Sequence, residues 1–223
     1  MMNEEHQEFD FFCSWSGGKD SCLALHRSAQ KVNRCRFLFT MINIDNVHSK
    51  SHNLTMDALQ AQADALGCTL RTGSAEWGTY EEEFIRQISR FKNDRIINGV
   101  FGDIDLEPHR EWVERVCGIA GITAHEPLWL ENRKKLVEEC VDLGIKSKIV
   151  VVNTKKMPER FLGREINREL ADELEAIGVD ACGENGEYHS YVHQAPLFSK
   201  KIKFIPGKTH TRDEYAFLDF SIQ

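Results

Sequence analysis

The chain has 223 residues, 41% of them hydrophobic, and a formal net charge of −7 at pH 7. This composition supports a hydrophobic core in one large domain or two smaller units, and the acidic balance argues against nucleic acid as an obligatory partner, since phosphate recognition needs clustered lysine and arginine. No apolar run approaches the roughly 20 residues that span a membrane, and the acidic opening MMNEEHQEFD is unlike a secretory signal, so we expect a cytoplasmic protein without membrane contact.

The first predicted strand, Phe9–Ser14, stops abruptly at the sequence SGGKDS, residues 16–21, and an apolar pattern at helical spacing then resumes. Two adjacent glycines allow positive φ angles or a close approach of the main chain to a ligand. A helix that opens at Asp20 would direct its unpaired N–H groups and the positive end of its dipole back at this loop. The sequence therefore predicts an anion site after the first strand.

Three further apolar strands are predicted in the first half of the chain, at Arg36–Asn43, Cys68–Thr72 and Arg95–Gly102. Amphipathic helices alternate with them, at Leu54–Gly67, Thr79–Phe91 and Pro108–Gly121. Near-continuous apolar strands that alternate with helices are typical of a parallel sheet covered on both faces, so the predicted fold class is α/β. Ligands of such sheets bind beyond the carboxyl ends of the strands at a topological switch point, which is where the glycine loop falls.

The alternation loosens after the segment His125–Leu130. A helix Glu131–Leu143, a strand Ser147–Asn153 and a helix from about residue 163 to 177 precede a stretch rich in glycine and aromatic residues. We place a domain boundary near residue 127. Residues 1–127 are predicted to bind a nucleotide, and residues 128–223 to form a smaller α/β domain that binds the substrate, with the site in the cleft between them.

Two further segments carry more functional groups than a plain connection requires. The fourth predicted strand ends at Gly102 and Asp103, which parallel topology would bring beside the glycine loop. The sequence GENGEYHS, residues 183–190, gathers two carboxylates, an imidazole and an amide. On the residues alone, the first segment also fits a turn or a helix cap, and the second a polar turn before an edge strand.

The glycine loop fits neither of the two commonest phosphate motifs. The Walker A pattern requires Ser or Thr after its lysine, but Asp20 follows Lys19, and GxGxxG fails because only Gly17 and Gly18 are present. SGGKDS instead resembles the pyrophosphate loop (PP-loop) of the N-type ATP pyrophosphatases, SGGxDS. This resemblance implies an adenine nucleotide alpha hydrolase-like (HUP), Rossmann-like domain that cleaves ATP between its α and β phosphates and activates a substrate oxygen as an adenylate.

The same resemblance implies an ATP site and a magnesium ion. Asp20 would help to hold Mg2+, and the strand end Met41–Asn43 would line the adenine. The implied ATP-binding residues are Ser14, Ser16, Gly17, Gly18, Lys19, Asp20, Ser21, Met41, Asn43 and Gly102.

The glycine loop, the Gly102-Asp103 strand end followed by PLW at residues 127–129, and GENGEYHS in this order resemble the diphthine–ammonia ligase family, from about Phe9 to Phe198. The resemblance implies an amide ligase in which ATP adenylates a carboxylate, pyrophosphate leaves, and ammonia displaces AMP. The lack of a glutaminase segment favours free ammonia over glutamine. The implied catalytic residues are Asp20, Asp103, Glu184, Glu187 and His189, and the implied acceptor-binding residues are Asn185, Tyr188 and Ser190.

One position departs from the family pattern. Members that act on diphthine carry Glu-Gly-Gly-Glu-(Phe or Tyr)-Glu-Thr where this chain reads ENGEYHS, residues 184–190, so His189 stands in place of a glutamate. Diphthine has a trimethylammonium group that acidic side chains favour, and an imidazole changes the charge offered to it.

The prediction is therefore the reaction class, with the carboxylate acceptor left open between a modified protein side chain and a small molecule. The alternatives are an amidation linked to cobalamin salvage, a tRNA-modifying PP-loop enzyme and a non-catalytic ATP-binding module. A homo-oligomer is also left open.

Other candidate residues have ordinary interpretations. His48 and His52 have an i, i+4 spacing that suits zinc, but they lack a nearby third ligand, so a mobile loop over the nucleotide is favoured. Seven cysteines without a CxxC pair predict reduced, mostly buried thiols rather than disulfides or a zinc knuckle. The basic residues Lys200, Lys201, Lys203 and Lys208 are interpreted as the solvated face of a late strand.

Overall fold

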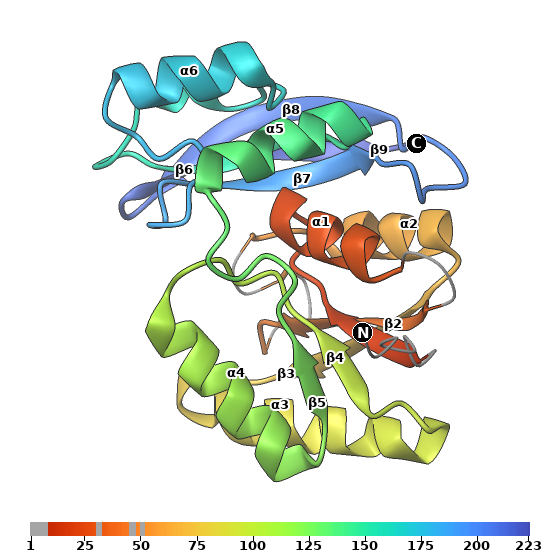
Figure 1. Ribbon diagram of the computed structural model, residues 1–223. Helices are drawn as coiled ribbons and strands as arrows, with labels where there is room; N and C mark the ends of the chain where they lie inside the picture. The colour runs from red at the N-terminus through yellow and green to blue at the C-terminus, as the bar shows by residue number, and fades with distance from the viewer. Residues whose placement is uncertain (1–8, 30–32, 45–47, 50–51) are drawn as a thin grey trace, which may run out of the picture.

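The fold is that of a computed structural model of the chain, which describes residues 9–29, 33–44, 48–49 and 52–223 (Figure 1). The acidic N-terminal residues 1–8 lie outside the described residues, as do residues 46, 47, 50 and 51 of the predicted loop around His48 and His52. In the part of the chain that is described, no helix is long and apolar enough to cross a membrane.

The first half of the chain forms a five-stranded sheet in which every neighbouring pair of strands is parallel. The strand order is β3-β2-β1-β4-β5. The strands are β1 Asp10–Ser14, β2 Arg34–Ile42, β3 Thr69–Ser74, β4 Asn98–Val100 and β5 Thr123–His125. Because the chain runs from β1 outward to β2 and β3 and then returns to the other side for β4 and β5, the switch point lies between β1 and β4.

Helices cover both faces of this sheet (Figure 1). α1 Lys19–Ser28 and α2 Met56–Leu66 lie on the face toward the second sheet, and α3 Tyr80–Arg90 and α4 Glu107–Ala120 lie on the opposite face. The outer face has its own aromatic core, in which Phe12, Phe39 and Phe91 are buried against one another. The predicted α/β class with a parallel sheet is confirmed.

The second half of the chain forms a four-stranded antiparallel sheet with the order β7-β6-β9-β8. Its strands are β6 Lys146–Asn153, β7 Tyr188–Gln194, β8 Phe204–Arg212 and β9 Tyr215–Ile222. The helices α5 Arg133–Leu143 and α6 Arg168–Ala176 pack beside this sheet (Figure 1). The proposed boundary near residue 127 falls between β5 and α5.

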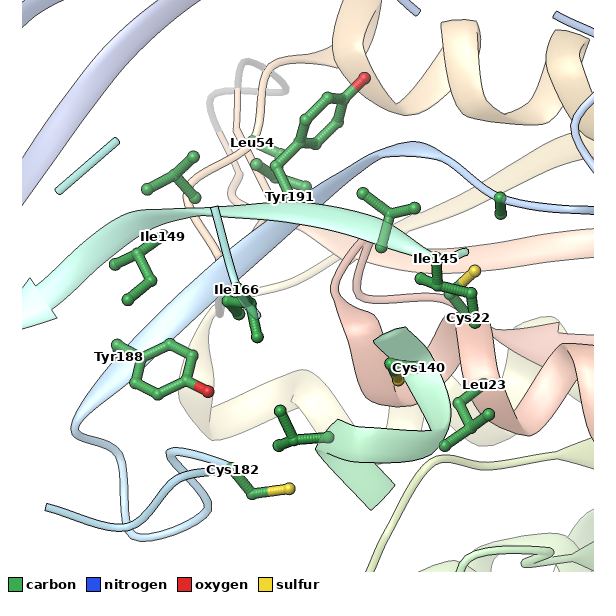
Figure 2. Packing of buried hydrophobic residues seen from close by; sticks show 14 of the residues in the cluster. Cys22, Leu23, Leu54, Cys140, Ile145, Ile149, Ile166, Cys182, Tyr188 and Tyr191 are labelled. Carbon is green, nitrogen blue, oxygen red and sulfur yellow. The ribbon is translucent and has the colours of Figure 1, made fainter. Parts of the chain in front are cut away.

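One hydrophobic core joins the two sheets through α1 and α2. In Figure 2, Cys22 and Leu23 of α1 lie beside Cys140 and Ile145 from the second half of the chain, and all four side chains are at most 3% exposed. A core that is continuous across both sheets fixes one half of the molecule against the other, because interior packing leaves little room for sliding.

Three elements, α6, β5 and β8, differ from the expected ones. The helix expected from about residue 163 begins at Arg168, because Asn167 caps it by accepting a hydrogen bond from the Leu170 N–H at 2.8 Å. The strand β5 has only three residues, too few for a recognisable pattern. The sequence pattern gives no bounds for β8, because its residues from Pro206 onward are mostly polar. The structure shows these residues, Lys208 among them, to be exposed.

The side chain of Gln62 on α2 connects the glycine loop to both halves of the molecule. It is fully buried, and its Oε1 accepts a hydrogen bond from Trp15 Nε1 at 2.8 Å. Its Nε2 donates to the carbonyl oxygens of Gly17 at 2.9 Å and Val192 at 2.7 Å. The N–H of Val192 also donates to the Gly17 carbonyl, at 3.0 Å. One amide therefore holds the loop, α2 and β7 together.

Replacement of Gln62 by leucine keeps the side-chain volume close to that of glutamine but removes all three hydrogen bonds. It leaves the buried Trp15 Nε1 without an acceptor and removes one donor from each of two carbonyl oxygens, so we expect the free energy of unfolding to fall by about 3 kcal/mol. Urea denaturation measures the loss. Gln60, exposed on the same helix, is the matched control, and Gln60→Leu should change stability by less than about 0.5 kcal/mol. Equal effects for the two variants would contradict this role for Gln62.

Candidate functional site

Close packing against neighbouring residues requires glycine at both Gly17 and Gly18. Gly17 has a φ of +83°, and a Cβ there would lie 2.4 Å from Leu54 Cδ1. A Cβ on Gly18 would lie 2.5 Å from His52 Cε1 and 3.2 Å from the Ser190 carbonyl oxygen. The loop therefore passes so closely beneath α2 and β7 that a side chain at either position would displace it.

Serine hydroxyls shape the loop where α1 begins. Ser16 Oγ accepts a hydrogen bond from the Gly18 N–H at 3.2 Å and lies 3.0 Å from Ser21 Oγ, which also lies 3.1 Å from the Gly18 carbonyl oxygen. The cap residue Gly18 has no side chain that could accept from the first turn of α1. The first N–H group of α1, that of Lys19, donates to Ser190 Oγ at 3.2 Å, and the anion site at this helix start stays a prediction.

A first cavity, of about 460 Å³, lies at the carboxyl ends of β1, β2 and β4. Six of the ten implied ATP-binding residues line it: Ser14, Ser16, Asp20, Ser21, Met41 and Gly102. The other four, Gly17, Gly18, Lys19 and Asn43, do not line it. Gly17 and Gly18 instead pack under α2 and β7, and the Asn43 carbonyl accepts a hydrogen bond from Ser74 Oγ at 3.2 Å.

An aromatic wall from α3 and α4 closes the first cavity on one side. Tyr80 stacks on Trp77 with ring centroids 5.8 Å apart and lies at the same distance from Trp112. Phe84 meets Trp112 edge to face at 4.8 Å. The sequence pattern places Phe84 and Trp112 on the packing faces of helices and gives Trp77 and Tyr80 no role. Their separation along the chain gives no signal that they line one cavity.

A second cavity, of about 440 Å³, opens on the side of the GENGEYHS segment. It is lined by all three implied acceptor-binding residues, by Glu184 and His189, and by Lys19. Four residues line both cavities: Asp20, His52, His109 and Glu184. We call the place where the cavities meet the junction and define it by these four residues.

Lys19 lines the second cavity and not the first, and the residue is only 2% exposed. Its Nζ donates to Asp20 Oδ2 at 2.9 Å and to the Cys182 carbonyl at 2.5 Å, and lies 5.2 Å from the centre of the Tyr188 ring. Burial by itself would lower the pKa of Lys19, but the nearby Asp20 carboxylate holds that pKa well above its usual value. The lysine stays charged and is shared between the loop and the second cavity.

Glu184 and the two histidines around it have strongly altered pKa values. Burial, with the charge of Asp20 as the next cause, raises the pKa of Glu184 to about 7. Burial lowers the pKa of His52 to about 4 and that of His189 to about 3. Because of these low pKa values, both imidazole rings are neutral at pH 7, and their centroids lie 4.5 Å apart.

The remaining implied catalytic residues take different positions. Asp103 lines the first cavity and lies 3.4 Å from His109 Nδ1, and this hydrogen bond raises the pKa of His109. Glu187 lines neither cavity. Its Oε1 accepts from Asn185 Nδ2 at 3.1 Å, while its buried Oε2 has no hydrogen-bond partner among the described residues. The structure therefore brings Asp20, Asp103, Glu184 and His189 around the junction but leaves Glu187 behind the cavity wall.

The acidic residues suit a magnesium ion that is shared with phosphates. In the described ranges, no group of three or more His, Cys, Asp or Glu side chains could hold a metal alone. Mg2+ is commonly bound by one or two carboxylates, with substrate phosphates and water as the other ligands. Asp20 and Asp103 line the same cavity, and their side chains are about a quarter exposed, at 24% and 23%. Two carboxylates of this kind fit that type of site.

A glycine loop at the first strand end of a parallel sheet, opening on a cavity at the switch point, defines an ATP-binding protein of the PP-loop class. Residues 11–124 match the diphthamide synthase N-terminal domain, and residues 132–220 match the diphthamide synthase C-terminal domain. The chain belongs to the diphthamide synthase family.

Curated relatives extend the similarity over most of the chain. It is 28% identical to diphthine–ammonia ligase of Rattus norvegicus, covering 90% of this chain and 85% of that protein. It is 26% identical to diphthine–ammonia ligase of Danio rerio, covering 92% and 91%. A predicted subunit of tRNA methyltransferase from Methanocaldococcus jannaschii DSM aligns at a TM-score of 0.43 and 15% identity, over 82% of this chain and 96% of that one, which is too weak a match for a functional comparison.

The segment after β4 passes close to the start of α1 at Gly102. A Cβ on Gly102 would lie 2.9 Å from both the Asp20 carbonyl carbon and the Ser21 nitrogen, and these are backbone atoms that cannot rotate away. We expect Gly102→Ala to push β4 from the start of α1 and to weaken ATP binding about tenfold, as measured by calorimetry. Gly118 is the matched control, since nothing lies within 4 Å of its Cβ position. Gly118→Ala should leave ATP affinity unchanged and stabilise α4 by about 0.5 kcal/mol. Unchanged affinity in Gly102→Ala would contradict the close approach.

Glu184 makes stability depend on pH in a direction that can be worked out. With a pKa raised from 4.5 to about 7, the folded chain keeps a proton that the unfolded chain releases. The contribution is therefore present at low pH and is lost as the pH rises through the window from 4.5 to 7. Relative to Glu184→Gln, the wild type should lose about 2 kcal/mol of unfolding free energy between about pH 5 and pH 8 in urea denaturation. Glu169→Gln, exposed on α6, controls for the loss of one carboxylate. Parallel pH curves for the wild type and Glu184→Gln would contradict the assignment.

Proposed function

We propose that the protein is an ATP-dependent ligase that forms an amide from a carboxylate and ammonia, releasing AMP and pyrophosphate. The observation that carries the proposal is the meeting of two cavities at the start of α1, one against the glycine loop and one against GENGEYHS. Adenylation needs such a junction, because the acceptor carboxylate must reach the α phosphate while the other phosphates stay on the loop. The names of the curated relatives support the same chemistry.

In the first step, an oxygen of the acceptor carboxylate attacks the α phosphorus of ATP. The bond between that phosphorus and the oxygen bridging to the β phosphate breaks, and pyrophosphate leaves with the electron pair. The start of α1 and the hydroxyls of Ser16 and Ser21, which line the first cavity, would hold the departing pyrophosphate. Asp20 and Asp103 would hold Mg2+, which offsets charge on the phosphates.

In the second step, ammonia attacks the carbonyl carbon of the acyl adenylate. A carbon–nitrogen bond forms, the bond from carbon to the AMP oxygen breaks, and AMP leaves with the electron pair. Ammonium must lose one proton before the attack and the new amide nitrogen another afterwards. Glu184 is the carboxylate at the junction whose raised pKa suits proton transfer near neutral pH.

The acceptor is the finer part of the proposal. The relatives are named diphthine–ammonia ligase, so we propose diphthine, a protein side chain, as the first acceptor to test. In this chain the second cavity offers a neutral imidazole at His189 and a Lys19–Asp20 ion pair. A carboxylate in place of His189 would attract a quaternary ammonium group more strongly than the neutral imidazole does. We therefore propose that the cavity also admits acceptors without that cation.

We extend the proposal to the organisation of the chain. Residues 1–127 would bind ATP and residues 128–223 would supply most of the acceptor side, with a cytoplasmic location suggested by seven free cysteines. The core shared by the two halves supports a fixed site rather than two independent modules.

The test incubates the protein with α-labelled ATP, magnesium, ammonium and either diphthine-bearing elongation factor or small carboxylic acids. We expect labelled AMP that depends on both the acceptor and ammonium, because adenylation splits ATP between its α and β phosphates. Asp103→Asn should lower the rate about a hundredfold by removing a carboxylate from the first cavity. Asp57→Asn, exposed on α2, is the control. Labelled ADP, or ATP binding with no product from any acceptor, would contradict the proposal and favour a binding module.

A further inference from the structure

The residue His52 belongs to none of the sequence motifs, yet it lies at the junction. Its Nδ1 is 2.9 Å from the carbonyl oxygen of Ser190, whose hydroxyl in turn accepts from the Lys19 N–H at 3.2 Å. Its ring lies over Gly18 and against the ring of His189, with the centroids 4.5 Å apart. His52 is thus fastened between the glycine loop and β7, where both cavities reach it.

The hydrogen bond to Ser190 fixes which nitrogen of His52 carries the proton. A carbonyl oxygen only accepts, so Nδ1 must be the donor. In a neutral ring the other nitrogen, Nε2, then presents a lone pair and no hydrogen. No described residue donates a hydrogen bond to it. Burial, which lowers the pKa of His52 to about 4, keeps the ring in this neutral form near pH 7.

Ammonia places a specific demand on a protein site. It has three N–H bonds to donate and one lone pair, and the lone pair must remain free to attack carbon. A suitable site therefore offers hydrogen-bond acceptors and no free donor. At the junction, the Glu184 carboxylate and His52 Nε2 can accept hydrogen bonds. The two cationic groups nearby are already paired, Lys19 with Asp20 and the Cys182 carbonyl, and His109 with Asp103 through Nδ1.

We propose that His52 and His189, with the carboxylate of Glu184, bind the attacking ammonia and leave its lone pair directed at the adenylate. The proposal rests on the ligase function proposed above and adds to it a nitrogen site and a residue, His52. Ammonia also carries the free lone pair that the attack needs, whereas the amide nitrogen of glutamine has none available.

The test uses variants that separate the two roles of the ring. Asparagine at position 52 places an amide nitrogen near the position of Nδ1, so His52→Asn can keep the hydrogen bond to Ser190 while it removes Nε2. His189→Phe keeps a ring beside His52 but removes its nitrogens. His210→Asn, on the exposed face of β8, is the control. Urea denaturation of each variant establishes that it is folded.

Two activities are measured with diphthine-bearing elongation factor. Exchange of labelled pyrophosphate into ATP without ammonium reports adenylation alone, and amide formation with increasing ammonium gives the KM for ammonium. We expect that KM to rise about tenfold in His52→Asn and His189→Phe, beyond any change in the exchange rate, and to stay constant in His210→Asn. An unchanged KM with exchange intact would overturn the ammonia site but not the ligase. Absence of exchange in the wild type would instead count against the proposed function with this acceptor.

Nitrogen-15 NMR of the histidine rings decides the inference without turnover. We expect His52 to show a protonated Nδ1 and a bare Nε2, and the Nε2 signal to move when ammonium chloride, but not tetramethylammonium chloride, is added in the presence of AMP. A proton on Nε2, or no response to ammonium, would overturn the proposal whatever the acceptor is.

Discussion

The side-chain amide of Gln62 binds the turn of the glycine loop to α2 and to β7, and both cavities take their shape from that turn. A fully buried amide is stabilising only if its donors and acceptor are satisfied, and here Trp15, Gly17 and Val192 satisfy them. The loop cannot shift without breaking a buried network. This rigidity matches what phosphate binding needs, because donors aimed at a developing charge help most when they do not have to reorganise.

The start of α1 distributes three consecutive side chains over the site. Successive residues of an α-helix point about 100° apart, so neighbours in sequence face different directions. Lys19 lines the second cavity, Asp20 lies at the junction, and Ser21 lines the first cavity. The glycine loop, whose motif resembles a phosphate-binding loop, thus also lines the second cavity through Lys19 and Asp20. The residues Ser16 and Ser21 line the first cavity, whereas Lys19 lines only the second.

Sequence patterns predict the parallel sheet and its helices because the central strand β1 and the second half of β2 are nearly continuous runs of buried apolar residues and the helices bury one face. They fail for β5, which is short, and for β8, whose exposed residues carry no alternation. In the site, local motifs predict Asp20 and Glu184, since each motif concentrates its chemistry in a few residues. His52 reaches the junction only through its contacts with Gly18 and Ser190, which no local pattern encodes. Glu187 shows the converse, because it belongs to the same motif as Glu184 but is buried and lines neither cavity.

The charges at the junction explain how a chain with a net charge of −7 can accommodate a polyphosphate. Asp20 is paired with Lys19, and the pKa of Glu184 lies near neutrality because burial and Asp20 both disfavour its ionised form. An arriving anion therefore meets a helix start, the neutral imidazoles of His52 and His189, and a carboxyl group that can take up a proton. The net negative charge of the chain repels an anion, but this repulsion is screened over about 8 Å at physiological salt. The groups close to the anion therefore govern its binding. In the proposed reaction, departure of the negative pyrophosphate would let Glu184 ionise again, at the stage when ammonium has to give up its proton.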